Sequence, residues 1–207
     1  FSSTQSMSRV FKITGAIFGV YTGLLSLSIG SHWINPFHKK FSYKVPDNDA
    51  TKPLTPSQLN DLDQRKDIEQ KVINMFNMKA TQPDLDIVDD NCLFADPSGS
   101  RKGKSAIGTI IFALPNIIHD HKMKDIEIER YSNAFTLKFD QSARAFGITL
   151  NSLETIVYVE LNEDNTRVTK IYDYWLGRPF FNGFGTGKVV RIINGKLFHD
   201  WYCRMNL

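Results

Sequence analysis

The sequence predicts an α+β fold in which helices pack on one face of a curved, mostly antiparallel sheet, preceded by one transmembrane helix. Residues 13–31 carry no charged side chain, which indicates the membrane helix. From residue 57 to about residue 115, apolar residues recur at helical spacing between turn residues. Further along, the spacing changes to two, as in Phe135, Leu137 and Phe139. Helices followed by long antiparallel strands are typical of α+β proteins.

Residues 10–34 form the predicted transmembrane helix. Lys12 is the only Lys, Arg, Asp or Glu in this segment, and roughly 20 apolar residues are enough to cross the core of a bilayer. Residues 1–9, FSSTQSMSR, are rich in hydroxyl groups and contain no acid. They resemble the remnant of a mitochondrial presequence, so we expect a single-pass protein of the mitochondrial inner membrane. Basic residues flank the helix on both sides, which leaves the side of the soluble domain open.

Three glycines inside the predicted membrane helix share one face. Gly15, Gly19 and Gly23 are spaced four residues apart, and small residues at this spacing let a second helix approach closely. We therefore expect helix–helix packing through this face. The alternative is that glycine is simply tolerated in membrane helices.

Residues 35–56 form a predicted linker. Pro36, Pro46, Pro53 and Pro56 are half of the eight prolines of the chain, and Lys and Asp residues lie between them. This composition is typical of an extended, solvated connector.

The predicted domain spans residues 57–182 and starts with a helix. Thr55 can cap this helix and Pro56 suits its first position. An imperfect apolar stripe then continues to Phe76, and Pro83 interrupts the pattern. A short helix is expected around residues 85–88.

The segment 92–104, CLFADPSGSRKGK, predicts a short strand, a turn at Asp96-Pro97, and a mobile basic loop. Aspartate is common in such turns because its side chain bonds to the neighbouring backbone. A second helix is expected over residues 106–114. Ser105 would cap it, and Pro115 would limit it to about three turns.

Alternating apolar and polar residues predict the strands. Ile126 and Ile128 alternate with glutamates, and residues 135–139 alternate in the same way. A β-branched strand is expected over residues 156–161. A turn over 162–166 and a last strand over 168–176 follow.

Residues 183–207 form a basic and aromatic extension. The run Gly183–Lys188 lacks the glycine and hydroxyl positions of a phosphate-binding loop, so a connector is the better interpretation. Asn194-Gly195 between two apolar runs predicts a hairpin, which we expect to pack on the domain, the membrane surface or a partner chain. The residues expected to contact a partner are Arg191, Lys196, Phe198, Trp201 and Tyr202.

Two groups of motif residues resemble the NTF2-like/SnoaL-like superfamily. The first group is Asp89, Asp90, Phe94, Asp96, Pro97, Gly103, Ile107 and Phe112, and the second is Ile171, Asp173, Trp175, Gly177 and Pro179. The resemblance covers residues 60–182 and implies a cone, in which a bent sheet wraps around helices. It also implies that the cone can enclose a pocket, in which some members use a buried aspartate as a general acid or base.

Asp173 is the best candidate for such an acid. Alternation places Asp173 with Ile171 and Trp175 on one face of a strand, opposite Tyr172 and Tyr174. An apolar wall would raise the pKa of its carboxyl group toward the working pH. The alternative is an acid that accepts a hydrogen bond at the mouth of the cone or at an interface.

The other candidates are weaker. Asp96 is expected to serve the turn, although it is also a candidate for the pocket. Tyr131 and Lys122 could line a pocket or lie on the surface. His119 and His121 resemble a metal pair but lack a third ligand, and the two cysteines have no metal spacing. We therefore expect no metal and no cofactor, and name no catalytic residue.

Charge and organisation suggest the function. Residues 51–177 hold 15 basic and 19 acidic side chains, and residues 178–207 hold five and one. The domain with its tail is therefore neutral, which argues against nucleic-acid binding. We expect a non-catalytic accessory subunit of a respiratory or ATP synthase complex, with membrane lipid and other subunits as partners. The alternatives are a SnoaL-like cyclase, isomerase or hydrolase for a hydrophobic substrate, and a membrane-tethered ribosome receptor or import component.

Overall fold

The computed structural model describes residues 46, 49–54, 62–97, 99–145, 148–175, 192–193, 195–196 and 203–205. Their elements, in chain order, are η1 (Asp49–Thr51), α3 (Leu62–Phe76), η2 (Gln82–Ile87), β1 (Val88–Ala95), β2 (Ser100–Lys102), α4 (Lys104–Ile117), β3 (Ile118–Arg130), β4 (Ala134–Ala145), β5 (Ile148–Leu161) and β6 (Val168–Trp175). The membrane helix predicted for residues 10–34, the helix start at Thr55 and Pro56, and the connector 183–188 lie outside these ranges. Among the helices that are described, none combines the length and the apolar character needed to span a bilayer.

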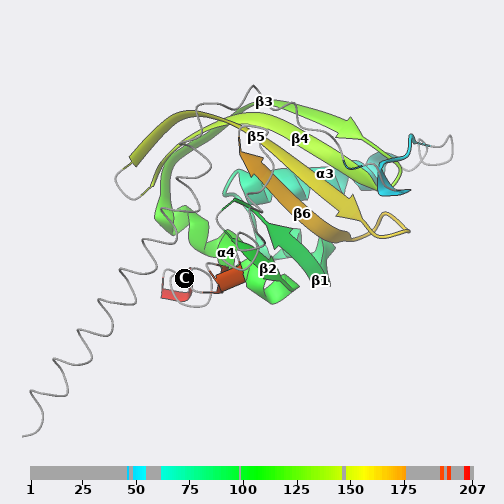
Figure 1. Ribbon diagram of the computed structural model, residues 1–207, viewed down its shortest axis with the longest axis horizontal. Coiled ribbons are helices and arrows are strands. Elements are labelled where there is room, and N and C mark those ends of the chain that lie inside the picture. Colours follow the sequence, from blue (N-terminus) through cyan, green and yellow to red (C-terminus); the bar gives the residue numbers. More distant parts are fainter. Residues whose placement is uncertain are drawn as a thin grey trace, which may run out of the picture.

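The strands form one curved sheet in the order β2-β1-β6-β5-β4-β3 (Figure 1). Every neighbouring pair is antiparallel except β1 and β6, which run parallel. Both α3 and α4 lie on the concave side of the sheet. The predicted α+β class and the mostly antiparallel sheet are confirmed.

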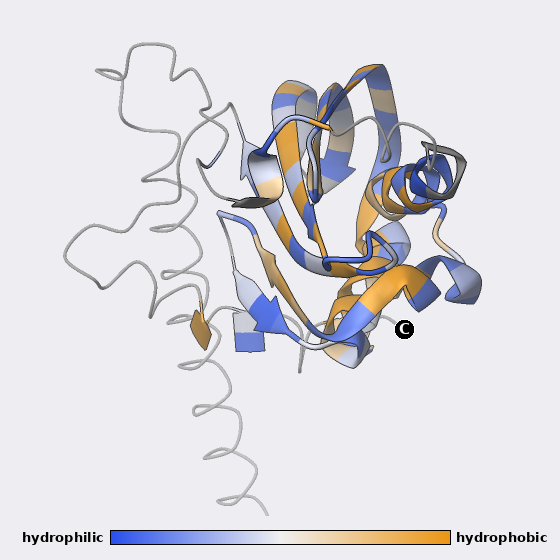
Figure 2. Cartoon of the chain, turned by 90° about the vertical axis from the view of Figure 1, so that its right-hand side faces the viewer, coloured by the Kyte–Doolittle hydropathy of each residue, from blue (hydrophilic) through white to orange (hydrophobic). Residues whose placement is uncertain are grey.

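Alternation explains which side chains enter the core. Phe135, Leu137 and Phe139 of β4 are buried, whereas Lys138 and Asp140 between and beside them are exposed. The same banding of apolar and polar residues runs along the strands in Figure 2. Strand β5 is longer than predicted because nearly its whole length pairs with β4.

One apolar core joins the helices to the sheet. The ring of Phe76 at the end of α3 lies 6.2 Å from the ring of Phe139, measured between centroids. The central members of this core are Ile68, Val72, Met75, Leu85, Val88, Ile107, Ile110, Phe135, Leu137, Phe139, Val157, Val159, Val168 and Ile171. The inner face of the sheet is therefore packed against side chains of α3, η2 and α4.

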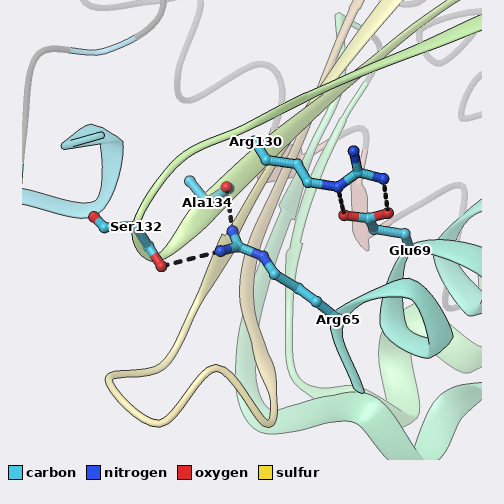
Figure 3. A network of polar contacts seen from close by, with 5 residues as sticks. All are labelled: Arg65, Glu69, Arg130, Ser132 and Ala134. Carbon is cyan, nitrogen blue, oxygen red and sulfur yellow. Dashed lines mark hydrogen bonds and ion pairs between the residues drawn. The ribbon is translucent and has the colours of Figure 1, made fainter. Parts of the chain in front are cut away.

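Two arginines fasten α3 to the sheet (Figure 3). Arg65 is buried and donates from Nη1 to the carbonyl oxygen of Ser132 (3.2 Å) and from Nη2 to that of Ala134 (2.6 Å). One turn later, Glu69 accepts two bonds of 2.7 Å from Arg130. These bonds link successive turns of the helix to the β3–β4 turn, and a guanidinium that grips a carboxylate with two bonds also sets its orientation.

The end of the predicted linker is bound to the same turn. The amide of Ser132 donates to the carbonyl of Lys52 (2.7 Å), and the amide of Asn133 donates to that of Ala50 (2.9 Å). Thr51 Oγ1 donates to the carbonyl of Pro46 (2.6 Å). Residues 49–52 are therefore part of the domain, and the prediction of a solvated linker was wrong for them.

The basic loop predicted after Asp96 is partly a strand. The amide of Asp96 donates to the carbonyl of Gly99 (2.9 Å), and the amide of Gly99 donates to Asp96 Oδ1 (2.5 Å). This tight turn reverses the chain, so that residues 100–102 pair with β1 as the edge strand β2. The turn role predicted for Asp96 is confirmed.

Helix α4 is longer than predicted at both ends. It starts at Lys104 after Gly103, whose φ of 106° suits glycine, so Ser105 lies inside the helix and does not cap it. Pro115 also lies inside, in the last turn, where its missing N–H leaves the carbonyl of Ile111 without a helical donor, and the helix ends two residues later at Ile117. The absence of a Cβ at Gly108 lets Leu85 of η2 pack against the helix.

Two described residues of the C-terminal extension, Gly195 and Cys203, pack on the domain. Residues 192–193 and 195–196 are helical, so the hairpin predicted at Asn194-Gly195 was wrong. Gly195 lies against the backbone of Ser100 in β2 so closely that a Cβ would clash. Cys203 is buried against Ala113 and Ile117 of α4. Gly195 therefore contacts the edge strand β2 and does not form the turn of a hairpin.

Glu69→Gln should lower the free energy of unfolding by about 1–3 kcal/mol, because one bond to Arg130 is lost and two N–H donors then face each other. Urea unfolding of the detergent-solubilised chain measures the change. Asp67→Asn is the matched control on the same helix. Its carboxylate is exposed and pairs with Lys71 at 2.7 Å, so it should cost less than about 0.5 kcal/mol. Equal effects of the two substitutions would contradict this.

Candidate functional site

Asp173 occupies an inward position near the end of β6, a central strand of the sheet. It is paired with Val157 of β5 and is 8% exposed. Its neighbour on the same face is Trp175, whose indole N–H donates to Asp173 Oδ2 (3.1 Å). Tyr172 and Tyr174 are in ring contact with each other on the opposite face. The face predicted for Asp173 is therefore confirmed.

Burial makes Asp173 a weak acid. It raises the pKa of the carboxyl group to about 8, with a further increase from the negative charge of Asp96 and a decrease from the Trp175 bond. Its Oδ1 atom is buried and has no hydrogen-bond partner within the part of the chain that the structure describes. At neutral pH the group is therefore mostly protonated, and it could donate or receive a proton near pH 8.

Asp96 lies on the neighbouring strand end. Ala95, the last residue of β1, pairs with Tyr172 of β6, so the parallel pair brings Asp96 toward Asp173. The Asp96 side chain also closes its own turn through Gly99. The structure thus brings Asp96, Asp173 and Trp175 together.

Tyr131 is separate from this group. It lies in the β3–β4 turn, beside Ala134, which pairs with Glu160 near the end of β5, whereas Trp175 pairs with Thr155 in the middle of that strand. Burial, with the neighbouring Glu129 carboxylate, raises the pKa of its hydroxyl group to about 12. Lys122 is exposed on β3. Neither residue belongs with Asp173.

Two polar residues of the inner face were missed by the sequence analysis. Gln141 donates to Thr155 Oγ1 (2.7 Å), and Thr155 is fully buried and paired with Trp175. His121 shares a bond of 3.2 Å with Gln141. The sequence did contain a signal for Gln141, because this residue continues the inward series Phe135, Leu137 and Phe139. Together with Asp173 and Trp175, these side chains form a polar strip, which runs across β6, β5, β4 and β3.

The two histidines of the metal hypothesis have different surroundings. His119 is exposed, whereas His121 is half-buried and its pKa is lowered by burial, partly offset by the bond to Gln141. Within the described ranges, no three His, Cys, Asp or Glu side chains are grouped so that they could hold a metal ion. A neutral His121 could accept or donate one hydrogen bond in the polar strip.

The partner-contact predictions fall mainly outside the described ranges. Lys196 is described and is exposed. The residues that are not described are Gly15, Gly19 and Gly23 of the membrane helix, and Arg191, Phe198, Trp201 and Tyr202 of the extension.

No family model matches the chain, and no curated protein matches it. Several solved structures are similar. An NTF2-like protein of unknown function from Cytophaga hutchinsonii is 15% identical, with a TM-score of 0.41 over 54% of this chain and 88% of that one. A putative isomerase from Bacillus subtilis is 17% identical, with a TM-score of 0.44 over 54% and 88%. A putative SnoaL-like polyketide cyclase from Shewanella putrefaciens is 12% identical, with a TM-score of 0.44 over 55% and 79%.

At these identities and TM-scores the three likenesses carry no argument about family or activity, and the fold stands on the strands and helices themselves.

The raised pKa of Asp173 predicts a pH dependence of stability. An unfolded aspartate releases its proton near pH 3.8, whereas the folded group holds it to about pH 8. The stability contributed by this group is therefore complete below about pH 4 and is lost as the pH rises through 8. Urea unfolding between pH 4 and 9 measures it. Asp173→Asn should flatten the decline, and Asp140→Asn, at an exposed position of β4, should not. If the free energy of unfolding of Asp173→Asn declined with pH as steeply as that of the wild type, the raised pKa of Asp173 would be contradicted.

Proposed function

We propose that the chain is a non-catalytic accessory subunit of a mitochondrial inner-membrane complex, of the respiratory chain or the ATP synthase, and that it acts in assembly or stability. The observation that carries the proposal is the packing of the concave face. Phe135 and Phe139, which would line a cone pocket, are buried in the core against α3. Because these side chains hold α3 on the sheet, the domain is a rigid body on which other subunits can assemble.

The attachment of flanking segments supports the same role. Residues 49–52 are bonded to the β3–β4 turn, and Cys203 is buried against α4. The domain is therefore joined closely to the chain on both sides, as suits a subunit that must hold one orientation among neighbours. The proposed location rests on the composition of residues 1–9 and on the apolar segment 10–34.

Extraction in mild detergent, followed by purification and mass spectrometry, tests the proposal. The protein should migrate in an assembly well above its own mass of 23.6 kDa. Gly19→Leu should reduce recovery of partners several-fold while leaving membrane insertion intact, because the bulky side chain separates packed helices. Val20→Leu, one residue away, is the matched control. A monomer at its own mass would overturn the proposal.

A second candidate function is acid–base catalysis on a hydrophobic substrate. Asp173 favours it, because its buried, protonated carboxyl lies on a strip that also contains Trp175 and Thr155, and its Oδ1 has no partner among the described residues. A general acid with a pKa near 8 suits a cyclase, isomerase or hydrolase.

A chain whose only tryptophan is Trp175, with Trp33→Phe and Trp201→Phe, tests this candidate. If the polar strip binds apolar molecules, titration with a mitochondrial lipid extract should shift the Trp175 fluorescence. Asp173→Leu in the same background should abolish the shift, because leucine offers the indole N–H no acceptor in place of the carboxyl oxygen. Identical fluorescence with and without lipid would argue against a ligand site.

A further inference from the structure

Three tyrosines form a continuous row of rings on the outer face of the sheet. Tyr158 of β5 stacks on Tyr172 of β6, with ring centroids 6.2 Å apart and an angle of 22° between the ring planes. Tyr172 in turn contacts Tyr174, with centroids 6.3 Å apart. The chain neighbours Val157 and Ile171 belong to the inner core, so the three rings point away from it. Tyr158, Tyr172 and Tyr174 are called the tyrosine row below.

The tyrosine row leads from the surface into the protein. Tyr172 and Tyr174 are half-buried, whereas Tyr158 is only 1% exposed. Tyr131 of the β3–β4 turn interacts with Thr136 and Tyr158 and helps to cover this end of the row. An oxidant in solution therefore meets Tyr172 or Tyr174 before it meets Tyr158.

The buried end of the row has a proton acceptor. The hydroxyl group of Tyr158 donates to Glu160 Oε2 (3.3 Å), and Lys170 Nζ donates to Glu160 Oε1 (2.6 Å) and holds the carboxylate in place. The side chain of Glu160 is 17% exposed, so a proton that reaches it can pass on to solvent. A tyrosine that loses an electron becomes a strong acid, and a hydrogen-bonded base then takes its proton. The neutral radical that remains has no desolvation penalty in a buried position, unlike a tyrosinate.

We propose that the tyrosine row is a radical relay, a function separate from assembly and from the chemistry of Asp173. A peroxyl radical takes the hydroxyl hydrogen atom of Tyr174, so that the phenolic O–H bond breaks and the O–H bond of a hydroperoxide forms. One electron then moves from Tyr172 to Tyr174 and one from Tyr158 to Tyr172. Each reduced ring recovers a proton from solvent, Tyr172 releases one to solvent while it is oxidised, and Tyr158 gives its proton to Glu160. The radical therefore ends on Tyr158, and the other two rings are unchanged.

A thiol completes the cycle at the exposed end of the row. Its S–H bond breaks, one electron passes along the row to Tyr158, a thiyl radical forms, and the thiol proton goes to solvent. Tyr158 recovers its own proton from Glu160. Until then, burial keeps the Tyr158 radical from coupling with a second tyrosine. The oxidised group also stays outside the inner core, which contains Met75 and Cys92, whose sulfur atoms are targets of oxidation.

Electron paramagnetic resonance of the full chain in detergent micelles tests the proposal, with a water-soluble azo compound as the source of peroxyl radicals. The wild type should give a tyrosyl radical that persists several-fold longer than the one in Tyr158→Phe. Tyr172→Phe should shorten the lifetime equally, although Tyr158 and Glu160 are intact, because phenylalanine keeps the ring contact and is not oxidised by a peroxyl radical. Tyr43→Phe, which removes one tyrosine hydroxyl upstream of the described residues, is the matched control and should leave the lifetime unchanged.

Glu160→Gln tests the proton step. Glutamine is close to glutamate in size but takes no proton from Tyr158, so the long-lived signal should fall several-fold in amplitude. The urea midpoints of the two phenylalanine variants should match that of the wild type, which shows that any change in lifetime is not caused by unfolding. Equal lifetimes in the wild type and Tyr158→Phe would overturn the proposal. A long-lived signal in Tyr172→Phe would also overturn it, because the radical would then reach Tyr158 without the row.

Discussion

The β3–β4 turn connects parts of the molecule that are far apart in sequence. The guanidinium of Arg65, in the first part of α3, donates to the carbonyl oxygens of Ser132 and Ala134 in this turn. The amides of Ser132 and Asn133 in the same turn donate to the carbonyls of residues 52 and 50. Its carbonyls and amides are thus satisfied by a helix on one side and by the linker end on the other, as buried backbone groups require. Removing either contact would leave polar groups of the turn without partners, so the position of α3 and the path of the chain into the domain both depend on the β3–β4 turn.

Much of the fold could be predicted because its signals are local. Alternation in β4 and β6 gave the inward side chains, including the face of Asp173. What failed depends on contacts between distant residues. Strand β2 has a basic sequence with little strand preference, and it forms because the Asp96–Gly99 turn returns it to β1. Asn194-Gly195 has the local signature of a hairpin, but Gly195 is required where the chain meets Ser100.

In the candidate site, too, local signals could be predicted and contacts between distant residues could not. Asp173 stood out in the sequence because it is an acid among aromatic residues. Thr155 and Gln141 did not, because each becomes informative only when the register sets it beside Trp175 or His121. The raised pKa of Asp173 is also a product of the fold, since burial is its largest cause and the nearby Asp96 arrives from another strand. Sequence gives the identity of such a group, and only packing gives its protonation.

Strand β5 carries a sequence feature that bears on the outer face. An antiparallel strand with one solvated face alternates apolar and polar residues, and β3 does so near its end, with Glu127 and Glu129 exposed. Residues 156–159 of β5 are instead Ile-Val-Tyr-Val, all buried. A continuous apolar run is typical of a strand covered on both faces. The sequence of β5 therefore agrees with the burial of Ile156 and Tyr158, whose side chains point away from the core formed with α3 and α4. In this strand the apolar run, rather than an alternating pattern, records that both faces are covered.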